Sequence, residues 1–234
     1  MNRLSGKRVL ITGASAGIGA ACARYFAAQG AHLLLSARRL EKVQALATSL
    51  TEEHGIQAHA HALDVTNRDA VNEYVFGLVA EELLPDVLIN NAGFGGHGKF
   101  VERDLAADLD MIDLNINALV TLCHLIGNDM VKHGSGKILN VSSTASYMPG
   151  PPQATYFATK AFVSSFSQAI AEELKGTGIT VTALEPGAVA TEFFETANLT
   201  GTKLGADSAS ADAVAKIGYD AMLAGKLTII NDPK

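Results

Sequence analysis

The stretch TGASAGIG, residues 12–19, decides the fold of this chain. It follows the apolar segment KRVLIT (7–12) and leads into GIGAACARYFAAQG (17–30), whose apolar residues recur at helical spacing. A strand that turns through glycines into a helix is either an ordinary connection or the phosphate-binding turn of a dinucleotide site. Glycines allow the left-handed backbone of so tight a turn and let it approach a pyrophosphate closely. Because strand and helix are both in place, the sequence predicts a dinucleotide site here.

Strand-like and helical segments alternate outward from this turn along the whole chain. Apolar runs typical of strands cover residues 7–12, 32–37, 57–65, 86–92, 136–143, 179–186 and 226–230. Stretches of helical periodicity cover residues 17–29, 40–54, 67–82, 105–133, 153–175 and 209–224. This alternation predicts an α/β fold, a parallel sheet with helices on both faces. No linker divides the 234 residues, so one domain over 1–234 is expected, with a substrate flap at about 188–208.

The composition is that of a globular protein with a sizeable core. Apolar residues make up 48% of the chain, which is enough to exclude wholesale disorder. The 24 acidic and 18 basic residues give a formal net charge of −6. A nucleic-acid binder needs a basic face for phosphates, so we expect no nucleic-acid partner.

The two cysteines and the lengths of the apolar runs indicate in which cellular compartment the protein is expected. Cys22 and Cys123 lie in apolar helical patterns without a CxxC pair, so we expect buried thiols and neither a disulfide nor a metal site. No apolar run reaches the roughly 18 residues of a membrane span. The first residues enter a strand directly, without the apolar segment of a secretory signal. The expected location is the cytoplasm, with no membrane partner.

The end of the second expected strand indicates which dinucleotide binds. An NAD site usually has an acid about 20 residues after the glycine turn, where it binds the ribose hydroxyls. This chain has Ser-Ala-Arg-Arg at 36–39, and Arg38 is placed to meet a 2′-phosphate. The alternative is that Arg38 and Arg39 are solvated charges, paired with Glu41. The sequence favours NADP(H), with NAD(H) still possible.

Asp64 stands at the end of the third expected strand. Its carboxylate can accept a hydrogen bond from an adenine amino group, with Val65 in contact nearby. Alternatively, Asp64 only precedes a helix whose N-cap is Thr66. The position at a strand's carboxyl end favours the role at the cofactor.

A possible catalytic pair lies in ATYFATKAFVSSFS (154–167), where Tyr156 and Lys160 are one helical turn apart. A phenol with a pKa of about 10 is a poor base at neutral pH, but a nearby ammonium stabilises its anion. Such a phenol can exchange a proton with an alcohol while hydride passes to or from carbon. Ser143, at the end of a strand, can supply a second hydrogen-bond donor where negative charge develops on oxygen.

With these motifs the chain resembles the short-chain dehydrogenases/reductases, in their single-domain branch. The residues that carry the resemblance are TGASAGIG (12–19), NNAG (90–93), Asn115, Ser143, YFATK (156–160) and EPGAVAT (185–191). The resemblance implies a three-layer Rossmann fold of about seven parallel strands, with three helices on each face. It also implies a homodimer or homotetramer, formed through helices 105–133 and 153–175.

The resemblance further implies roles for single residues. Tyr156 is then the catalytic acid/base, Lys160 lowers its pKa and binds the nicotinamide ribose, and Ser143 orients the substrate. Asn115 holds a water in a proton relay to Lys160; a buried structural asparagine is the alternative. The expected cofactor-binding residues are Gly13, Ser15, Gly17, Ile18, Gly19, Arg38, Arg39, Asp64, Val65, Asn91, Ala92, Gly93, Tyr156, Lys160, Pro186, Gly187, Val189 and Thr191.

The expected substrate is a small carbonyl compound or alcohol. Besides Ser143 and Tyr156, the residues expected to touch it are Phe94, His97 and Phe193. The largely apolar lining, including the loop around 144–151, favours an apolar substrate over a highly charged one. Lys99 and Arg103 are expected to be surface charges; the alternative is that they steer an acidic substrate. Glu185 departs from the family pattern, since smaller or neutral residues are usual before Pro186, and it can alter the pocket floor.

The leading expectation is an NADP(H)-dependent oxidoreductase that interconverts a carbonyl and a secondary alcohol. One alternative is an NAD-dependent alcohol dehydrogenase. The other is a non-catalytic protein that binds NADP(H) and senses its level. The presence of every residue of the catalytic set favours an enzyme.

Overall fold

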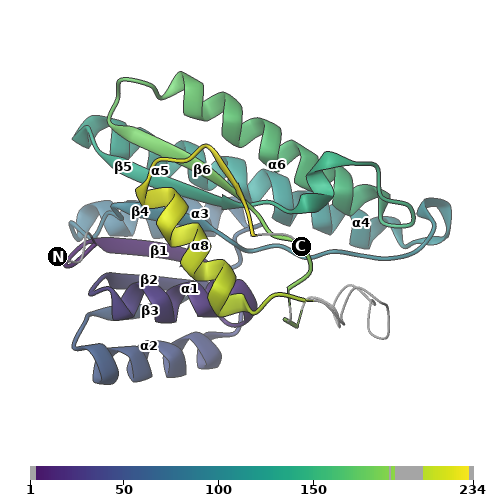
Figure 1. The fold of residues 1–234 in the computed structure, drawn as a ribbon. Helices are drawn as coiled ribbons and strands as arrows, with labels where there is room; N and C mark the ends of the chain where they lie inside the picture. Colours follow the sequence, from purple (N-terminus) through teal and green to yellow (C-terminus); the bar gives the residue numbers. More distant parts are fainter. Residues whose placement is uncertain (1–3, 190, 193–207, 232–234) are drawn as a thin grey trace.

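The protein is represented by a computed structural model that describes residues 4–189, 191–192 and 208–231 (Figure 1). Most of the flap expected at about 188–208, including Phe193, therefore lies outside the described residues. The described strands form one parallel sheet in the order β3-β2-β1-β4-β5-β6-β7. They are β1 (Arg8–Thr12), β2 (His32–Ala37), β3 (Ala58–Ala62), β4 (Val87–Asn90), β5 (Gly136–Val141), β6 (Ile179–Glu185) and β7 (Thr228–Ile230). The strand order reverses between β1 and β4, which is the switch point where open α/β sheets bind ligands.

Helices cover both faces of the sheet, as expected (Figure 1). On one face lie α1 (Gly17–Ala28), α2 (Leu40–His54) and α8 (Ala211–Leu223). On the other face lie α3 (Arg68–Ala80), α4 (Leu105–Ile112), α5 (Leu119–His133) and α6 (Ala154–Glu173). The fold is thus the three-layer Rossmann arrangement, and the expected boundaries agree with the observed ones to within a few residues.

Each face of the sheet has its own apolar core because side chains alternate along the strands. In β1, Val9 and Ile11 pack beneath α1 and α2, whereas Leu10 packs on the opposite face. All three side chains are fully buried. A strand buried on both sides needs this continuous apolar sequence, which is the pattern that predicted a parallel sheet.

The segment 105–133 is one continuous helix in which a π-helical turn, Asp113–Ala118, joins α4 to α5. By length and mean hydropathy this helix could cross a membrane, so the expectation that no segment qualifies was wrong. The core helices of soluble proteins pass the same test. Leu122 and Ile126 of α5 are buried in the core on the α3–α6 face of the sheet, as in such a core helix.

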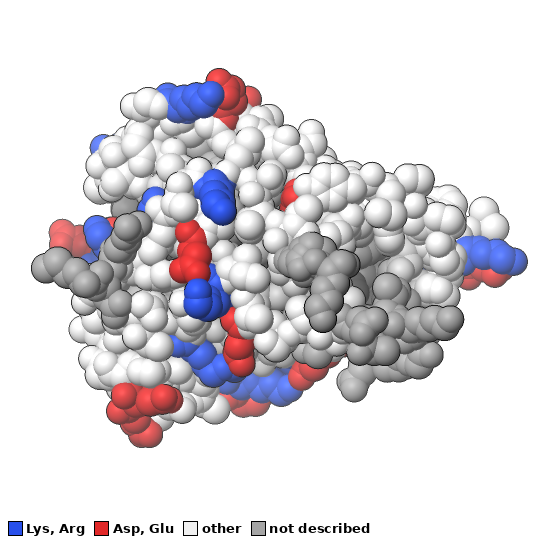
Figure 2. Space-filling view, viewed as in Figure 1, with Lys and Arg blue, Asp and Glu red and all other residues white. Residues whose placement is uncertain are grey.

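Charges of both signs are interspersed on the face of the molecule shown in Figure 2. Arg24 of α1 pairs with Asp212 of α8 at 2.8 Å, and Lys216 pairs with Asp220 at 2.6 Å. Within the described part of this face no broad basic surface is visible.

The glycine turn after β1 has the geometry that its sequence predicts. Gly13 and Gly17 have φ of 66° and 55°, in the left-handed region that favours glycine. At position 19, any side chain larger than that of glycine is excluded for a different reason. A Cβ there would collide with the carbonyl oxygen of Gly13 and with the side-chain amide of Asn91.

Gly19→Ala is therefore expected to destabilise the protein by roughly 1–3 kcal/mol, since the colliding atoms belong to a tightly held turn. Gly77→Ala is the matched control, because a Cβ at this position in α3 meets nothing within 4 Å. It should stabilise the protein by about 0.5–1 kcal/mol through helix propensity. Urea unfolding of both variants measures the difference, and a Gly19→Ala variant as stable as the wild type would contradict the packing described.

Candidate active site

A cleft of about 1210 Å³ opens at the carboxyl ends of the strands. All but four of the predicted site residues line it. The lining ones are Gly13, Ser15, Gly17, Ile18, Arg38, Arg39, Asp64, Val65, Asn91, Ala92, Gly93, Phe94, Ser143, Tyr156, Lys160, Pro186, Gly187, Val189 and Thr191. Gly19, His97 and Asn115 do not line it, and Phe193 lies outside the described residues.

The N-terminus of α1 forms one wall of the cleft. Its N-cap, Ala16, offers no side-chain hydrogen bond to the first turn, and this turn holds no acid. The initial backbone N–H groups and the helix dipole therefore favour an anion. With left-handed glycines at 13 and 17, this end of the cleft fits the pyrophosphate of a dinucleotide.

Basic side chains gather at the end of β2. The Arg39 guanidinium donates to the Ser15 hydroxyl at 3.0 Å and to the Glu192 carboxylate at 2.8 Å. Lys42 also reaches Glu192, at 3.1 Å. These hydrogen bonds lower the pKa of Glu192. Glu192 therefore occupies part of a basic cradle that would suit a 2′-phosphate.

Two members of this cradle were missed by sequence reasoning. Lys42 lies in the first turn of α2, three residues after Arg39, and this position could have indicated it. Glu192 follows the predicted cofactor residue Thr191 but gave no sign that it would meet residues 150 positions away. The suggested partner of the arginines was Glu41, whereas the structure pairs Arg39 with Glu192.

Asp64 lies at the rim of the cleft and accepts hydrogen bonds from the backbone and hydroxyl of Thr66, at 3.0 and 2.7 Å. Burial opposes its ionisation, but the Thr66 hydrogen bonds and the Arg38 charge lower its pKa overall. The alternative that Thr66 caps the next helix is wrong. The N-cap of α3 is Asn67, whose side chain accepts from the backbone of Ala70 at 3.1 Å.

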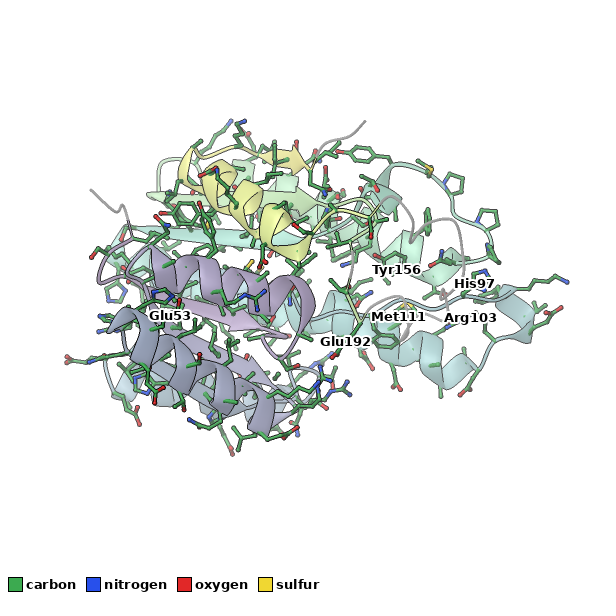
Figure 3. The ribbon with its side chains drawn as sticks, turned by 60° about the horizontal axis from the view of Figure 1, so that its bottom comes forward. Glu53, His97, Arg103, Met111, Tyr156 and Glu192 are labelled. Atoms are coloured by element: carbon green, nitrogen blue, oxygen red, sulfur yellow. The ribbon has the colours of Figure 1, made fainter. Side chains whose placement is uncertain are left out.

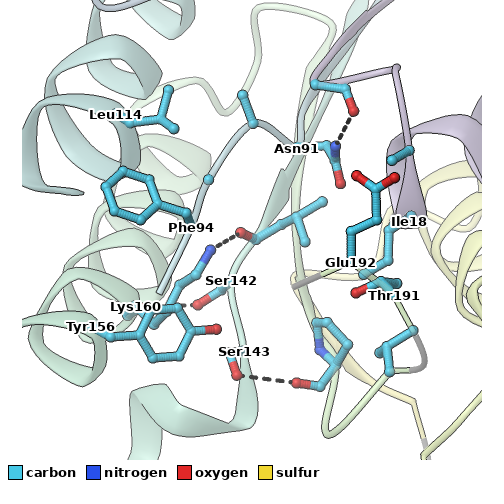
Figure 4. Close-up of a pocket in the computed structure, with 18 of the residues that line it drawn as sticks. Ile18, Asn91, Phe94, Leu114, Ser142, Ser143, Tyr156, Lys160, Thr191 and Glu192 are labelled. Carbon is cyan, nitrogen blue, oxygen red and sulfur yellow. Dashed lines mark hydrogen bonds between the residues drawn. The ribbon is translucent and has the colours of Figure 1, made fainter. Parts of the chain in front are cut away.

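Tyr156, Ser143 and Lys160 converge at the other end of the cleft (Figure 4). In Figure 4 the Tyr156 hydroxyl lies on the side of its ring that faces Ser143. The Lys160 ammonium donates to the carbonyl oxygen of Val141 at 2.9 Å, and the Ser143 hydroxyl donates to that of Pro186 at 3.2 Å. Helix α6 and the end of β5 thus place the three groups of the predicted catalytic set together.

The electrostatics of this set differ from the sequence expectation. Burial raises the pKa of Tyr156 to about 12, and a hydrogen bond with Ser143 only partly offsets this. Burial also lowers the pKa of Lys160 to about 8. The Lys160 nitrogen is 5.9 Å from the centre of the Tyr156 ring. The expected lowering of the tyrosine pKa by lysine is therefore not seen in the cleft without cofactor, because burial dominates for both groups.

Asn115 lies behind the cleft wall, in the π-helical turn. Its amide nitrogen donates to the Phe94 carbonyl and to the Thr159 hydroxyl, both at 3.0 Å, and its oxygen accepts from the Phe94 backbone at 3.1 Å. The side chain thus fixes the segment that follows β4. This geometry supports the structural alternative for the side chain, and the water relay stays a prediction.

The remaining wall of the cleft has apolar surface from Phe94, Leu114, Met148 and Phe157, and Asp110, Asp113 and Gln153 also line it. His97, expected at the substrate, is not one of them.

Arg103 was wrongly expected to be a surface charge. Arg103 lies beside His97 (Figure 3). Its guanidinium donates to the His97 carbonyl at 3.0 Å and pairs with the buried Asp108 at 2.7 Å. Its charge is therefore satisfied within the protein and does not serve the cleft.

Comparisons with a family model and with curated proteins indicate the same family. The family model described as "short chain dehydrogenase" matches residues 7–201. Sulfoacetaldehyde reductase 2 of Chromohalobacter salexigens is 37% identical over 208 residues, which span 88% of this chain and 79% of the relative. The NADP-dependent 3-hydroxy acid dehydrogenase YdfG of Escherichia coli K12 is 38% identical over 187 residues, or 79% of this chain and 74% of the relative.

Solved structures of similar fold match almost the whole chain. A short-chain dehydrogenase from Sphingobium yanoikuyae in complex with NADPH has a TM-score of 0.90 and 34% identity, with 96% of this chain and 87% of that chain covered. L-sorbose reductase from Gluconobacter frateurii, complexed with NADPH and L-sorbose, has a TM-score of 0.88 and 27% identity, with 98% and 96% covered.

The buried Lys160 gives the stability a specific pH dependence. Its pKa falls from 10.5 in the unfolded chain to about 8 in the folded protein. Between these values the unfolded chain binds the extra proton, so stability rises with pH; below pH 8 the folded protein carries the full cost of a buried charge. Lys160→Met should therefore be more stable than the wild type at pH 7, by up to roughly 3 kcal/mol. This advantage should vanish towards pH 10.5.

Urea unfolding between pH 7 and 10.5 measures this trend without any substrate. Lys99→Met is the matched control, because Lys99 is exposed and should show no comparable change with pH. An advantage of Lys160→Met that stayed constant across this range would contradict the effect of burial.

Proposed function

This chain belongs to the short-chain dehydrogenase family, and on that premise we propose that it interconverts a carbonyl and a secondary alcohol with NADP(H), using Tyr156 as acid/base. The family acts on hydroxyl and carbonyl groups with a nicotinamide cofactor. The main observation behind the proposal is that Tyr156, Ser143 and Lys160 converge in one cleft. The same cleft contains the glycine turn and the N-terminus of α1, which has no side-chain cap. A bound NADPH supplies the hydride.

The residues of the cleft would divide the remaining work. Ser143 turns its hydroxyl from the Pro186 carbonyl to the substrate oxygen and stabilises the charge that develops there. Tyr156 is protonated at neutral pH, since its pKa is about 12, and it donates a proton to the same oxygen. Lys160, held by the Val141 carbonyl, compensates the negative charge that the tyrosine then acquires.

The cofactor choice rests on the basic cradle at the end of β2. Arg38 lines the cleft, and Arg39 lies against Ser15 of the glycine turn. Related proteins whose descriptions name NADP or NADPH support the same choice. NAD(H) use remains the alternative for a protein of this fold, and a non-catalytic NADP(H) sensor is disfavoured by the assembled catalytic set.

The substrate we propose is a neutral, largely apolar carbonyl compound or the matching alcohol. Phe94, Leu114, Met148 and Phe157 supply the apolar wall, and among the described lining residues at this end only Lys160 is a cation. Sulfoacetaldehyde and 3-hydroxy acids, named for two relatives, carry a negative charge, for which the described lining residues at this end offer one cation, Lys160, against the two carboxylates of Asp110 and Asp113.

We propose a cytoplasmic homodimer or homotetramer as the working form. Helix 105–133 and α6 keep apolar side chains at their surfaces: Leu105 and Leu109 are 65% and 51% exposed, and Phe162 is 37% exposed. Faces of this kind suit contacts between subunits.

Tyr156→Phe tests the acid/base role. The variant should lose at least about 100-fold in turnover, because general acid catalysis contributes that much, while NADPH still binds. Initial rates on a carbonyl panel and NADPH fluorescence titration measure the two quantities. Undiminished turnover would remove Tyr156 from the mechanism, and a wild-type protein that reduces no carbonyl would favour the sensor.

The cradle predicts opposite effects for two charge changes. Arg38→Asp should weaken NADPH by roughly 10–100-fold and leave NADH nearly unchanged, because only the former carries a 2′-phosphate. Glu192→Gln should instead tighten NADPH by a few-fold, since it removes the carboxylate that now pairs with Arg39 and Lys42. Fluorescence titration with both cofactors checks both variants, and equal changes for NADPH and NADH would refute the phosphate contact.

A further inference from the structure

Glu185, at the end of β6, carries a fully buried carboxyl group that the proposed mechanism does not use. Burial of a charge or of an unpaired polar group is costly, so a carboxyl group in this position needs partners. An apolar residue of similar volume would avoid that cost. The partners of Glu185 therefore indicate what the residue does.

Two hydroxyl groups from separate segments bind the two oxygens of Glu185. Tyr147, in the 3-10 helix η3 (Thr144–Tyr147), donates a hydrogen bond to Oε2. Ser164 of α6 lies 2.6 Å from Oε1. Hydrogen bonding to Glu185 raises the pKa of Tyr147 to about 12, so the phenol remains a donor at neutral pH.

The contacts continue from Ser164 to the catalytic helix itself. The hydroxyl groups of Ser164 and Ser142 are 2.7 Å apart, and Ser142 donates to the backbone carbonyl of Lys160 at 2.9 Å. We name Tyr147, Glu185, Ser164 and Ser142 the Glu185 cluster. It runs unbroken from η3, beside the cleft, to the backbone of the catalytic lysine.

The cluster joins two parts of the cleft that have different tasks. Met148, next to Tyr147, lines the apolar wall where the substrate would lie. Lys160 and Ser143 belong to the catalytic set, and Ser143 directly follows Ser142. Tyr147 is 57% exposed, and its hydroxyl contact ties this end of η3 to the end of β6.

We propose that Glu185 is a positioning residue that fixes the substrate wall at 147–148 and the catalytic helix in one arrangement. This inference rests on the proposed function for its kinetic consequences. Loosening the Tyr147 contact frees the wall and weakens substrate binding. Loosening the Ser164 contact also removes support for the backbone of Lys160 and so slows turnover.

The proton inventory identifies the variant that should keep the cluster intact. Four hydrogen-bond contacts link the members of the cluster to one another and to the Lys160 carbonyl, and each contact needs one proton. The hydroxyl groups of Tyr147, Ser164 and Ser142 supply only three of these protons. A side chain at 185 with one acceptor and one donor can supply all four contacts. Glutamine has both groups, so Glu185→Gln is the conservative variant, whereas Glu185→Ala removes both contacts.

One experiment tests the positioning without any substrate. The chain has no tryptophan, so Met148→Trp introduces a single fluorophore into the wall. In this background, Tyr147→Phe and Glu185→Ala should raise the acrylamide quenching constant by roughly twofold, because the segment becomes mobile. Glu185→Gln should leave it unchanged.

Kinetics then measure the functional consequence in the otherwise wild-type chain. Tyr147→Phe should raise KM for a carbonyl substrate roughly three- to tenfold, with kcat and NADPH affinity unchanged, since one hydrogen bond outside the chemistry is lost. Glu185→Ala should raise KM and also lower kcat, and Glu185→Gln should restore both. Tyr25→Phe, on α1 and packed against Tyr219, is the control for the loss of a tyrosine hydroxyl.

The outcomes separate this inference from the function on which it rests. If Tyr147→Phe and Glu185→Ala lower the melting temperature but leave quenching and KM at wild-type values, Glu185 only stabilises the fold and the inference is overturned. If Glu185→Ala does not fold, Tyr147→Phe decides alone. If no variant, including the wild type, reduces a carbonyl, the proposed function fails, while the quenching series still decides the positioning.

Discussion

The cleft depends on an interlock between the turns that follow β1 and β4. The Thr12 hydroxyl, itself buried, accepts hydrogen bonds from the backbone N–H groups of Asn91 and Ala92, both at 3.1 Å. In return, the Asn91 side chain donates to the carbonyls of Thr12 and Gly13, at 3.0 and 3.2 Å. Two neighbouring strands are thus joined where the order of the sheet reverses. The glycine turn and the segment leading to Phe94 keep fixed positions on either side of the crevice.

This fixed frame keeps the proposed catalytic pair, Tyr156 and Lys160, in surroundings that disfavour charge on either side chain. Tyr156 and Lys160 are both held in a buried part of the cleft, where burial disfavours the charged form of each. Burial makes the Lys160 ammonium unfavourable, and a negative charge formed beside it would offset this cost. In the proposed reaction the phenol loses its proton, and a site built in this way would stabilise that state at the cost of a less stable resting state.

The sequence predicted what depends on local periodicity and on short motifs. Helix α2 and strand β2 have the expected bounds, and the glycine turn has the expected backbone conformation. Contacts between distant segments gave no such signal. Arg39 meets Glu192 across 153 positions, and Tyr147 meets Glu185 across 38. The pKa of Tyr156 could not be foreseen either, because it follows from burial, which the Tyr-x-x-x-Lys spacing does not report.

Polarity changes along the strands in a way that separates stability from function. The middles of β1 and β5 are apolar and buried, whereas Thr12 and Asn140 near their carboxyl ends, and Ser142 just beyond β5, are buried polar groups with hydrogen bonds. Glu185 continues this pattern at the end of β6. Buried polar groups contribute less to stability than apolar ones of equal volume, but their partners must take one arrangement. The apolar middles of the strands therefore hold the sheet together, and the polar groups at their carboxyl ends fix the geometry of the cleft. Replacing these polar groups should change the reaction before it unfolds the protein.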